Sequence, residues 1–397
     1  MTLPRLLTLL SDEIPSAILL RHRLHSTPEI GGAEYETCRA IRELLPVPYR
    51  SAAGTGLIAR VGPSGIPSVV VRAELDALEI TEETDAPFAA TNGHMHACGH
   101  DVHASALLAL VRAAHRMGDD LPVPLVAVFQ PSEERQPSGA VALLETGELT
   151  PEQATAMVAV HVHPDLPWGS IGAEAGAVNA AADAVLIEIE GRGGHAAYPH
   201  RTRDPVLALS HLVVAVHGLV GRHIDPLHGA TITVGAVHAG SAENVIPSTA
   251  QARLTIRAMD ESDQEELRAA VRKTAVHVAE AFGCTAELTF VKSEPVLVND
   301  PALALRTQEL AAGAGFTVSP PWRSCGGDDF AHYGAHAPSL MAFVGLNGAP
   351  GFIHAGLHDR RFLPPDATVA AVARAQALCY VAAITPAAGR PAAGTSV

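Results

Sequence analysis

Ten consecutive residues carry an unusual concentration of side chains that can bind a metal ion. The segment reads His94-Met95-His96-Ala97-Cys98-Gly99-His100-Asp101-Val102-His103. Its imidazole nitrogens and its thiol suit zinc, or the neighbouring divalent ions manganese, cobalt and nickel. The chain has 21 histidines, so a histidine cluster alone is weak evidence, and a polar turn that caps the following helix is the alternative interpretation. The thiol of Cys98, among imidazoles and beside a glycine, favours the metal site.

Two adjacent acids, Glu133 and Glu134, form the second chemical signal. They follow the apolar run at residues 124–129, and neighbouring carboxylates repel each other strongly when they are partly buried. A divalent cation removes that repulsion, and one carboxylate is then a metal ligand while the other accepts a proton from water. The alternative is a solvated acidic turn with Arg135 as its partner.

Short apolar runs predict the elements that position these groups. Residues 68–72, 124–129 and 156–160 are rich in valine and bounded by proline or polar turns, which predicts buried strands. Residues 104–117 and 139–145 have helical periodicity. Strands that alternate with helices indicate an α/β fold with a mostly parallel central sheet.

The chemical groups follow the ends of these predicted strands. Glu133 and Glu134 lie in a short loop after the second run, and His161 directly follows the third. His100 lies in the loop before the helix that is expected to begin near Ala104. Because the carboxyl ends of parallel strands meet at one edge, where α/β proteins bind ligands, we expect three loops to bring these donors together.

The pattern changes at about residue 180. Four strand-like stretches and two helical stretches follow, at residues 184–191, 231–237, 252–258 and 285–290 and at residues 205–220 and 262–281. This pattern predicts an α+β sandwich inserted at residues 180–291. The α/β pattern then resumes and ends in a helix at about 366–383. The predicted domains are therefore 1–179 with 292–397, and 180–291.

Length and composition limit the class of protein. A chain of 397 residues usually forms two domains, and 48% hydrophobic against 17% charged residues excludes a disordered protein. The formal net charge of −15 argues against nucleic acid and anionic membrane as partners. No uninterrupted apolar run reaches the ~18 residues of a membrane span. Five scattered cysteines show no disulfide pattern, which fits the reducing cytoplasm.

Several further segments accompany these signals in a fixed order along the chain. They are Arg23-Leu24-His25-Ser26-Thr27-Pro28-Glu29, Arg72-Ala73-Glu74-Leu75-Asp76-Ala77-Leu78, Met95-His96-Ala97-Cys98-Gly99-His100-Asp101, Phe129-Gln130-Pro131-Ser132-Glu133-Glu134, His161-Val162-His163-Pro164, Gly193-Gly194-His195-Ala196-Ala197-Tyr198-Pro199-His200, Asn244-Val245-Ile246-Pro247, Asp328-Asp329-Phe330 and Leu357-His358. In this order the chain resembles the M20 metallopeptidase clan over nearly its whole length. The resemblance is to its amidohydrolase subfamily of N-acyl-amino-acid aminoacylases, hippurate hydrolases and auxin-conjugate hydrolases.

The resemblance implies a ligand set for divalent metal. The ligands of the family match Cys98, His100, Glu134, His161 and a late histidine, which is His358 with His354 as the alternative. Such a set holds one ion, or two ions that share a water; zinc, manganese, cobalt and nickel all remain open. Glu133 matches the general base of the family.

The resemblance also assigns roles around this set. Asp76 matches a carboxylate that orients His100 without binding the metal. His195 matches the histidine that polarises the substrate carbonyl, often from the other subunit of a dimer. Asn244 is expected to hydrogen-bond the substrate or the oxyanion, and Arg257 to anchor a substrate carboxylate. From the residues alone, a turn role for Asp76, a surface position for His195 and a strand-face position for Arg257 remain alternatives.

The implied protein is an enzyme with a metal-dependent exopeptidase-like catalytic domain and an inserted lid or dimerisation domain. Its implied reaction is hydrolysis of the amide of an N-acyl-amino acid, in which Glu133 takes a proton from water and returns it to the leaving amine. A dipeptidase or carboxypeptidase that uses the same site is the alternative. A non-catalytic metal-binding protein is a third interpretation, which the presence of both Glu133 and His195 disfavours.

The chain departs from the family pattern at positions close to the predicted cleft. The family usually has Asp at Glu74, Pro at Glu79, Gly at Arg135 and Glu at Asp328, and a Gly-Thr pair is Leu254-Thr255 here. None of these changes removes a ligand or the base. They leave the substrate preference open, and Glu74, Glu79 and Asp328 keep the peptidase alternative in place.

The inserted domain is expected to form a homodimer, or a dimer of dimers, with its copy in a second chain. The helix at residues 205–220 and the neighbouring strands offer a helix face and a sheet edge to a symmetric partner. His195 would then enter the cleft of the partner. The alternative is a lid that serves only its own chain.

Overall fold

The computed structural model describes residues 2–292 and 294–385, and the chain divides into two compact units. Within the described residues, the first unit comprises the chain up to Gly176, Val298–Trp322 and the chain from His332 onward. The second unit comprises Ala177–Leu297 and Arg323–Ala331. It therefore contains a segment, Arg323–Ala331, beyond the expected insertion at residues 180–291. The last part of the expected first domain, residues 386–397, lies outside the described residues.

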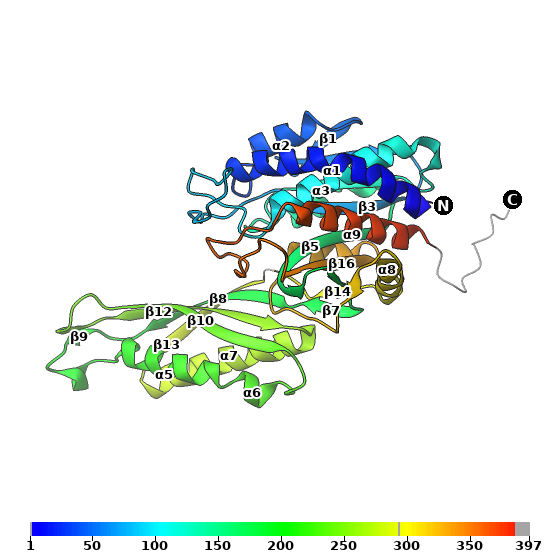
Figure 1. Cartoon of the computed structure of the whole chain (residues 1–397). Coiled ribbons are helices and arrows are strands. Elements are labelled where there is room, and N and C mark those ends of the chain that lie inside the picture. Colours follow the sequence, from blue (N-terminus) through cyan, green and yellow to red (C-terminus); the bar gives the residue numbers. More distant parts are fainter. Residues whose placement is uncertain (1, 293, 386–397) are drawn as a thin grey trace. The chain divides into compact units, whose positions relative to one another are not determined.

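The first unit contains one large sheet and most of the helices, as Figure 1 shows. Its helices are α1 (Thr2–Ser26), α2 (Tyr35–Arg42), α3 (His100–Met117), α4 (Gly139–Glu145), α8 (Pro301–Gly313) and α9 (Ala367–Ile384), with short 3₁₀ helices η1 (Gly118–Asp120) and η2 (Thr150–Glu152). Its strands are β1 (Tyr49–Ala52), β2 (Gly56–Val61), β3 (Ser68–Glu74), β4 (Leu125–Gln130), β5 (Ala154–Pro167), β6 (Ser170–Gly172), β15 (Thr317–Val318) and β16 (Ser339–Asn347). Three further elements lie where the chain passes between the units, namely β7 (Gly176–Asn179), β14 (Leu297–Asn299) and η4 (Asp329–Ala335).

The sheet of the first unit has eight strands in the order β1-β2-β4-β3-β5-β16-β6-β15. Its centre is parallel, because β4, β3, β5 and β16 pair in parallel, and β1 and β2 add an antiparallel edge. The expected α/β fold with a mostly parallel central sheet is therefore confirmed. The carboxyl ends of β4, β3 and β5 meet at one edge of this sheet, as parallel pairing requires.

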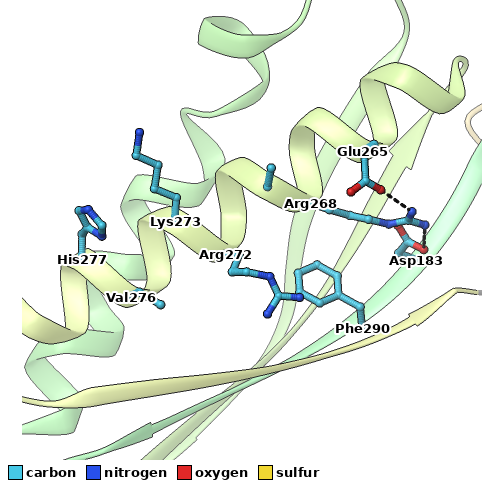
Figure 2. Close-up of a pocket in the computed structure, with 9 residues that line it drawn as sticks. Asp183, Glu265, Arg268, Arg272, Lys273, Val276, His277 and Phe290 are labelled. Atoms are coloured by element: carbon cyan, nitrogen blue, oxygen red, sulfur yellow. Dashed lines mark hydrogen bonds and ion pairs between the residues drawn. The ribbon is translucent and has the colours of Figure 1, made fainter.

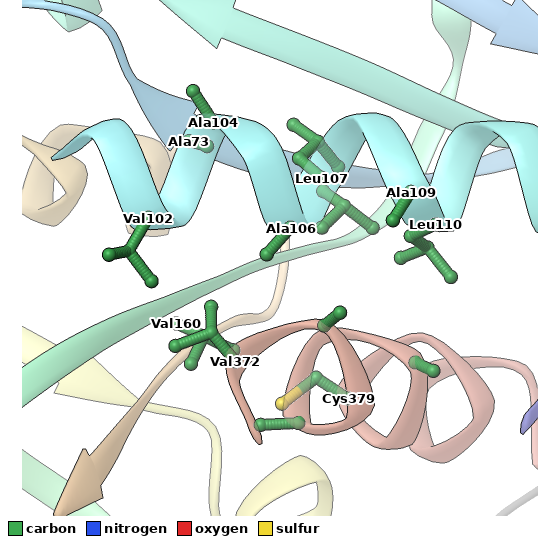
Figure 3. Close-up of a cluster of buried hydrophobic side chains, with 14 of the residues drawn as sticks. Ala73, Val102, Ala104, Ala106, Leu107, Ala109, Leu110, Val160, Val372 and Cys379 are labelled. Atoms are coloured by element: carbon green, nitrogen blue, oxygen red, sulfur yellow. The ribbon is translucent and has the colours of Figure 1, made fainter. Parts of the chain in front are cut away.

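Helix α3 is the central element of the hydrophobic core in the first unit. It packs against α1 and α9, and Figure 3 shows its Val102, Ala106 and Leu110 facing Val160 of β5 and Val372 of α9. Small and branched residues fill this layer because the chain has few aromatic residues. Burial of each such leucine or valine contributes about 2 kcal/mol. The helix that carries His100 is therefore held in place by the core.

Helix α9 is the one helix of the described chain that is long and apolar enough to cross a membrane by length and composition. Arg374 interrupts its apolar sequence, and 67% of it is buried inside the structure. Its buried face includes Val369, Val372 and Leu378, which belong to the core of the first unit. We therefore interpret α9 as a core helix.

The second unit is an antiparallel sheet covered by helices. Its four-stranded sheet has the order β10-β12-β8-β13, and β9 pairs with β11 in a separate two-stranded sheet. The elements are β8 (Ala181–Glu190), β9 (Gly194–His195), η3 (Pro199–Arg201), α5 (Pro205–His217), α6 (Val220–His223), β10 (Ala230–Ala239), β11 (Val245–Ile246), β12 (Thr249–Ala258), α7 (Glu261–Ala281) and β13 (Thr285–Lys292). Alternate residues of β8 and β12 pack under α5 and α7, as expected for a half-buried sheet. The predicted α+β character of this region is confirmed.

Two elements differ from expectation where they carry site residues. Helix α3 begins at His100 and not near Ala104, so His100 lies in its first turn. Strand β5 continues past Val160 to Pro167 because β16 pairs beside it over this length. His161 therefore lies inside a strand and not in a loop after it.

Helix α7 borders a groove of about 610 Å³ on the surface of the second unit, shown in Figure 2. At one end of the groove, the guanidinium of Arg268 donates two hydrogen bonds to the buried carboxylate of Asp183, at 2.6 and 2.7 Å. At its centre, Arg272 lies 4.7 Å from the ring centroid of Phe290. Only the first of these contacts neutralises a buried charge.

Replacement of Arg268 is expected to destabilise the second unit. Arg268→Ala leaves the Asp183 carboxylate buried without its cation, which costs about 3 kcal/mol. The control Arg272→Ala removes an exposed cation–π contact and costs about 0.5 kcal/mol. Urea denaturation, with hydrogen exchange followed in β8 and α7, measures both. Equal losses for the two variants would contradict this role for the Arg268–Asp183 pair.

Candidate active site

The backbone before α3 forms a tight turn that only glycine accommodates. Gly99 has a φ of +88°, and a Cβ atom there would lie 2.8 Å from a methyl carbon of Val162. His358, with a φ of +65°, donates its backbone N–H to the carbonyl of Ala97 at 2.9 Å. A non-glycine residue in this left-handed region is strained, and such strain concentrates at functional sites. Two segments distant in sequence are thereby joined beside His100.

Five predicted metal ligands lie together in the first unit. A sulfur, a nitrogen and an oxygen from Cys98, His100 and Glu134 lie within 4.8 Å of one another. The Sγ atom of Cys98 is 3.5 Å from Nε2 of His161. Oε1 of Glu134 is 3.3 Å from Nε2 of His358. The structure thus brings the five donor groups into one connected cluster.

The hydrogen bonds of two histidines direct a ring nitrogen into this cluster. Nδ1–H of His100 donates to the backbone carbonyl of Asp76 at 2.9 Å, and Nδ1–H of His161 donates to the carbonyl of Val162 at 2.6 Å. Each neutral ring then presents Nε2 as a lone pair. In residues 2–292 and 294–385, the buried Nε2 of His100 has no hydrogen-bond partner. A buried acceptor nitrogen without a hydrogen-bond donor, next to a thiol and a carboxylate, fits a metal site.

The pKa shifts of the groups in this cluster also fit a bound cation. Burial, followed by the charges of Glu134 and Glu133, raises the pKa of the Cys98 thiol well above its usual value. Burial lowers the pKa of His161 well below its usual value, which keeps the ring neutral. Burial also opposes charge on His100, but Asp76, Glu74 and Glu134 outweigh it and raise its pKa to about 10. The carboxylates here favour positive charge, and a divalent ion supplies it while displacing the protons.

Asp76 connects two of the loops that carry donors. One carboxylate oxygen accepts the backbone N–H of Glu134 at 2.9 Å, and the other lies 3.3 Å from Nδ1 of His100. Burial raises the pKa of Asp76, but the hydrogen bond and charge of His100 and the backbone N–H groups of Glu134 and Glu133 together outweigh this and lower the pKa. The carboxylate therefore stays charged and orients a histidine and a glutamate together.

His103 is close to the cluster, yet its two nitrogens are already used. Nδ1–H donates to Glu74 at 2.8 Å, and Nε2 accepts the backbone N–H of Val162 at 3.0 Å. A set of Glu74, His100, His103 and His161 is also compact enough for a metal. However, the lone pair of His103 is occupied, and Glu74 also binds Arg72. His103 and Glu74 thus support the strand beside His161.

Glu133 and Glu134 lie in a loop with a constrained backbone. Ser132 before them has a φ of +53°, and its N–H donates to Glu34 at 2.8 Å. The carboxylate of Asp76 holds the loop on its other side, through Glu134. The side chain of Glu133 is half-buried beside this anchored backbone. The loop can therefore present Glu133 as a base next to the metal cluster.

The two candidate late histidines have different neighbours. Nε2 of His358 lies beside Glu134, as described above, whereas Nε2 of His354 lies 3.5 Å from Asp165. Both side chains of the second pair are exposed. Proximity to Glu134 therefore supports His358 as the fifth ligand.

His195 and Asn244 are neighbours in the second unit. His195 of β9 pairs with Val245 of β11, and the N–H of Ala196 donates to the carbonyl of Asn244 at 3.1 Å. Nδ1 of His195 accepts the N–H of Ala197 at 3.0 Å. A neutral ring therefore carries its proton on Nε2, which is the tautomer that donates to a carbonyl. Both side chains are exposed.

Arg257 lies far from His195 within the same unit. β9 and β11 are at the end of the sheet where β12 begins, whereas Arg257 is near the other end of β12 (Figure 1). A strand of 10 residues is about 30 Å long. Arg257 there donates to the carbonyl of Cys325 at 3.4 Å. The structure therefore does not bring Arg257 together with His195 and Asn244.

A buried charge network behind the cluster was not expected from the sequence. Asp101 accepts hydrogen bonds from Arg21 at 3.1 Å and from His25 at 2.9 Å. Burial opposes charge on His25, but Asp101 and Glu82 outweigh it and raise its pKa to about 9. Arg21 also binds Asp366 before α9. The motif around His25 was visible in the sequence, but its partners were not.

The chain is similar to proteins of one family in sequence and in fold. The model of peptidase family M20/M25/M40 matches residues 70–379. An N-acetyl-L-cysteine deacetylase from Bacillus subtilis strain 168 is 36% identical over 335 residues, which are 83% of this chain and 80% of the relative. An N-acetyldiaminopimelate deacetylase from Halalkalibacterium halodurans is 33% identical over 360 residues, 89% of this chain and 95% of the relative. A solved dinuclear metal-binding peptidase of the M20 family from Bacillus subtilis has a TM-score of 0.79 at 28% identity, and the match covers 94% of this chain and 98% of that chain.

His358→Ala is expected to weaken metal binding, whereas His354→Ala is not. Loss of a residue that only orients a ligand already lowers metal affinity by about tenfold or more. Loss of a ligand itself should lower the affinity by at least as much. After chelation, Co²⁺ titration followed by visible absorption and by metal analysis measures the affinity of each variant. Circular dichroism controls for folding. If His354→Ala loses the metal and His358→Ala keeps it, the fifth ligand is wrong.

Proposed function

The chain belongs to peptidase family M20/M25/M40, and we propose that it is a metal-dependent amidohydrolase that hydrolyses the amide bond of N-acyl-amino acids. The observation that carries the proposal is the buried cluster of Cys98, His100, His161 and Glu134, next to the half-buried Glu133. The two curated relatives described above are named as deacetylases of N-acetylated amino acids, which supports this substrate class.

The proposed cofactor is one or two divalent metal ions. Cys98, His100, Glu134, His161 and His358 would hold them, and the mixture of thiolate, imidazole and carboxylate suits zinc, manganese, cobalt or nickel. Bound metal would supply Lewis acidity, which polarises the substrate carbonyl and acidifies water. The solved M20 neighbour named as dinuclear supports two ions. All five cysteines of the chain are free, which supports the reducing cytoplasm as the compartment.

Glu133 is the proposed general base and acid. Its carboxylate accepts a proton from the attacking water as the new C–O bond forms at the substrate carbonyl. It then gives that proton to the amide nitrogen as the C–N bond breaks, and the products are a carboxylic acid and a free amine. Asp76 acts only through position, because it holds the backbone of the adjacent Glu134.

His195, Asn244 and Arg257 are the proposed substrate contacts from the second unit. Nε2–H of His195 would donate to the carbonyl oxygen as negative charge develops there. Asn244 adds a second polar group beside it. Arg257 would bind the carboxylate of the amino-acid part of the substrate. Because Arg257 lies near the end of β12 whereas His195 lies beside its start, one small substrate would meet them from two different chains.

Two of the three acids that keep the peptidase alternative in place, Glu74 and Glu79, have partners within the protein. Glu79 forms an ion pair with Arg135 at 2.7 Å, and Glu74 binds His103 and Arg72. Neither carboxylate is therefore left for a free substrate amine, which a dipeptidase must recognise. This supports the amidohydrolase over the dipeptidase.

The proposed assembly is a homodimer through the second unit. Strand β10 pairs only with β12 among the described strands, and its sequence carries no acidic residue, lysine or arginine. A groove of about 340 Å³ between β10 and α5 is lined by Val206, Leu209, Val213 and Val237. A long uncharged edge next to an apolar groove favours pairing with a symmetric copy.

Glu133→Gln is expected to lower kcat by orders of magnitude while metal and fold remain. The amide cannot take a proton from water, and general-base catalysis is worth roughly 10²-fold or more in kcat. The wild type, loaded with Zn²⁺, Mn²⁺ or Co²⁺, is offered N-acetyl- and N-benzoyl-amino acids together with dipeptides. Turnover of dipeptides alone would overturn the proposed substrate class. Retention of more than about a tenth of kcat in Glu133→Gln would overturn the proposed base.

Mixing two inactive variants tests whether His195 serves the partner subunit. Glu133→Gln and His195→Ala chains should together regain activity, since one site in a mixed dimer then has both groups intact. Subunit exchange is verified with differently tagged chains. Full exchange without recovered activity would show that each chain completes its own site.

A further inference from the structure

Strand alternation places two aromatic positions on the same side of the sheet as the predicted ligand His161. His163 lies two residues further along β5, and successive side chains of a strand point to opposite faces. Phe343 of β16 is the register partner of His161 in the parallel pair of strands seen side by side in Figure 1. His161, His163 and Phe343 therefore share the face opposite to Val160 and Val162, which belong to the core.

A third ring, that of Trp322, packs onto this pair. Its centroid lies 4.3 Å from that of His163, at an interplanar angle of 61°, and 4.6 Å from that of Phe343. Phe343 is buried and the side chain of His163 is 12% exposed, whereas Trp322 is only partly buried. His163 and Phe343 therefore pack against one side of the Trp322 ring, and part of the ring surface remains available to a ligand.

We call His163, Trp322 and Phe343 the aromatic wall, and the residues at its border are polar. Asp165 donates its backbone N–H to Nδ1 of His163 at 3.3 Å, and its exposed carboxylate pairs with His354. An apolar surface with a few polar groups at its border is typical of a small-molecule binding site. The wall also begins next to a metal ligand, because His161 and Phe343 are in register.

We propose that His163, Trp322 and Phe343 form the acyl-binding wall of the active site, and that the enzyme prefers aromatic acyl groups over acetyl. The inference rests on the proposed function. If the substrate carboxylate is bound by Arg257 of the second unit, the opposite end of the substrate, its acyl group, is left for the first unit. A planar aroyl group stacks on an indole and covers it, whereas the methyl of an acetyl group covers little of the ring.

The kinetic test compares two substrates that differ only in the acyl group. Wild type and Trp322→Leu, both loaded with metal, are assayed with N-benzoylglycine and N-acetylglycine. The ratio of kcat/KM for benzoyl over acetyl should fall by about tenfold or more in Trp322→Leu, because contacts of an apolar pocket discriminate by roughly that factor. The matched control is Trp168→Phe, which alters the other tryptophan of the chain, on the core side. Its ratio should remain that of the wild type.

Circular dichroism and Co²⁺ titration serve as the folding and metal-loading controls for Trp322→Leu. An unchanged ratio in that variant, or a wild type that prefers acetyl, overturns the acyl-binding wall while the amidohydrolase assignment stands. A metal-loaded wild type that hydrolyses neither substrate nor any other N-acyl-amino acid overturns the proposed function. The proposed acyl-binding role of Trp322 is then overturned as well.

A binding measurement gives a readout besides turnover. In the Glu133→Gln background, loaded with metal, N-benzoylglycine should change the tryptophan fluorescence in a saturable way. The change should persist after Trp168→Phe and vanish after Trp322→Leu. A signal that survives the loss of Trp322 would show that the acyl group binds elsewhere.

Discussion

Negative groups buried at one edge of a parallel sheet are the constraint on which the rest of the site depends. Glu74, Asp76 and Glu134 bring carboxylates into the interior, and each needs a compensating charge or hydrogen-bond donors. Glu74 obtains them from Arg72 and His103, and Asp76 from His100 and a backbone N–H. Oε1 of Glu134 is buried and lies 3.3 Å from Nε2 of His358, among donors suited to a metal. Glu74 and Asp76 are thus neutralised by protein groups, whereas Glu134 lies among the donors that fit a metal ion.

The position of this cluster is set by the helices behind it. Helix α3 carries the adjacent residues His100 and Asp101, and these two residues have partners in different parts of the first unit. His100 is aimed at the ligand cluster by Asp76, whereas Asp101 is held from behind by Arg21 and His25 of α1. Arg21 extends the same network to Asp366 at the start of α9. The predicted ligand His100 is therefore held in place by charges as well as by the apolar packing of α1, α3 and α9.

The two units divide the chemistry between them. The first unit holds the predicted ligands, the proposed base and the proposed aromatic wall, which all demand exact placement on a rigid core. In the proposed mechanism the second unit contributes the exposed His195 and Asn244 beside the start of β12, and the partly buried Arg257 near the end of that strand. Such a unit suits closure over a substrate and pairing with a copy, since its uncharged strand β10 has a free edge within the described chain.

The sequence by itself determined the fold class, the elements and the chemical nature of the site. Valine-rich runs, helical periodicity and ordered motifs around Cys98 and Glu134 are local features, and local features can be recognised without coordinates. Only the tertiary structure decided which atoms meet. The start of α3 at His100 depends on the close approach of Gly99 to Val162, and the extension of β5 depends on β16. The pairing of His354 with Asp165, the occupied lone pair of His103 and the packing of Trp322 on His163 depend equally on contacts between distant segments. Those contacts are set by packing of the whole chain, which no local pattern encodes.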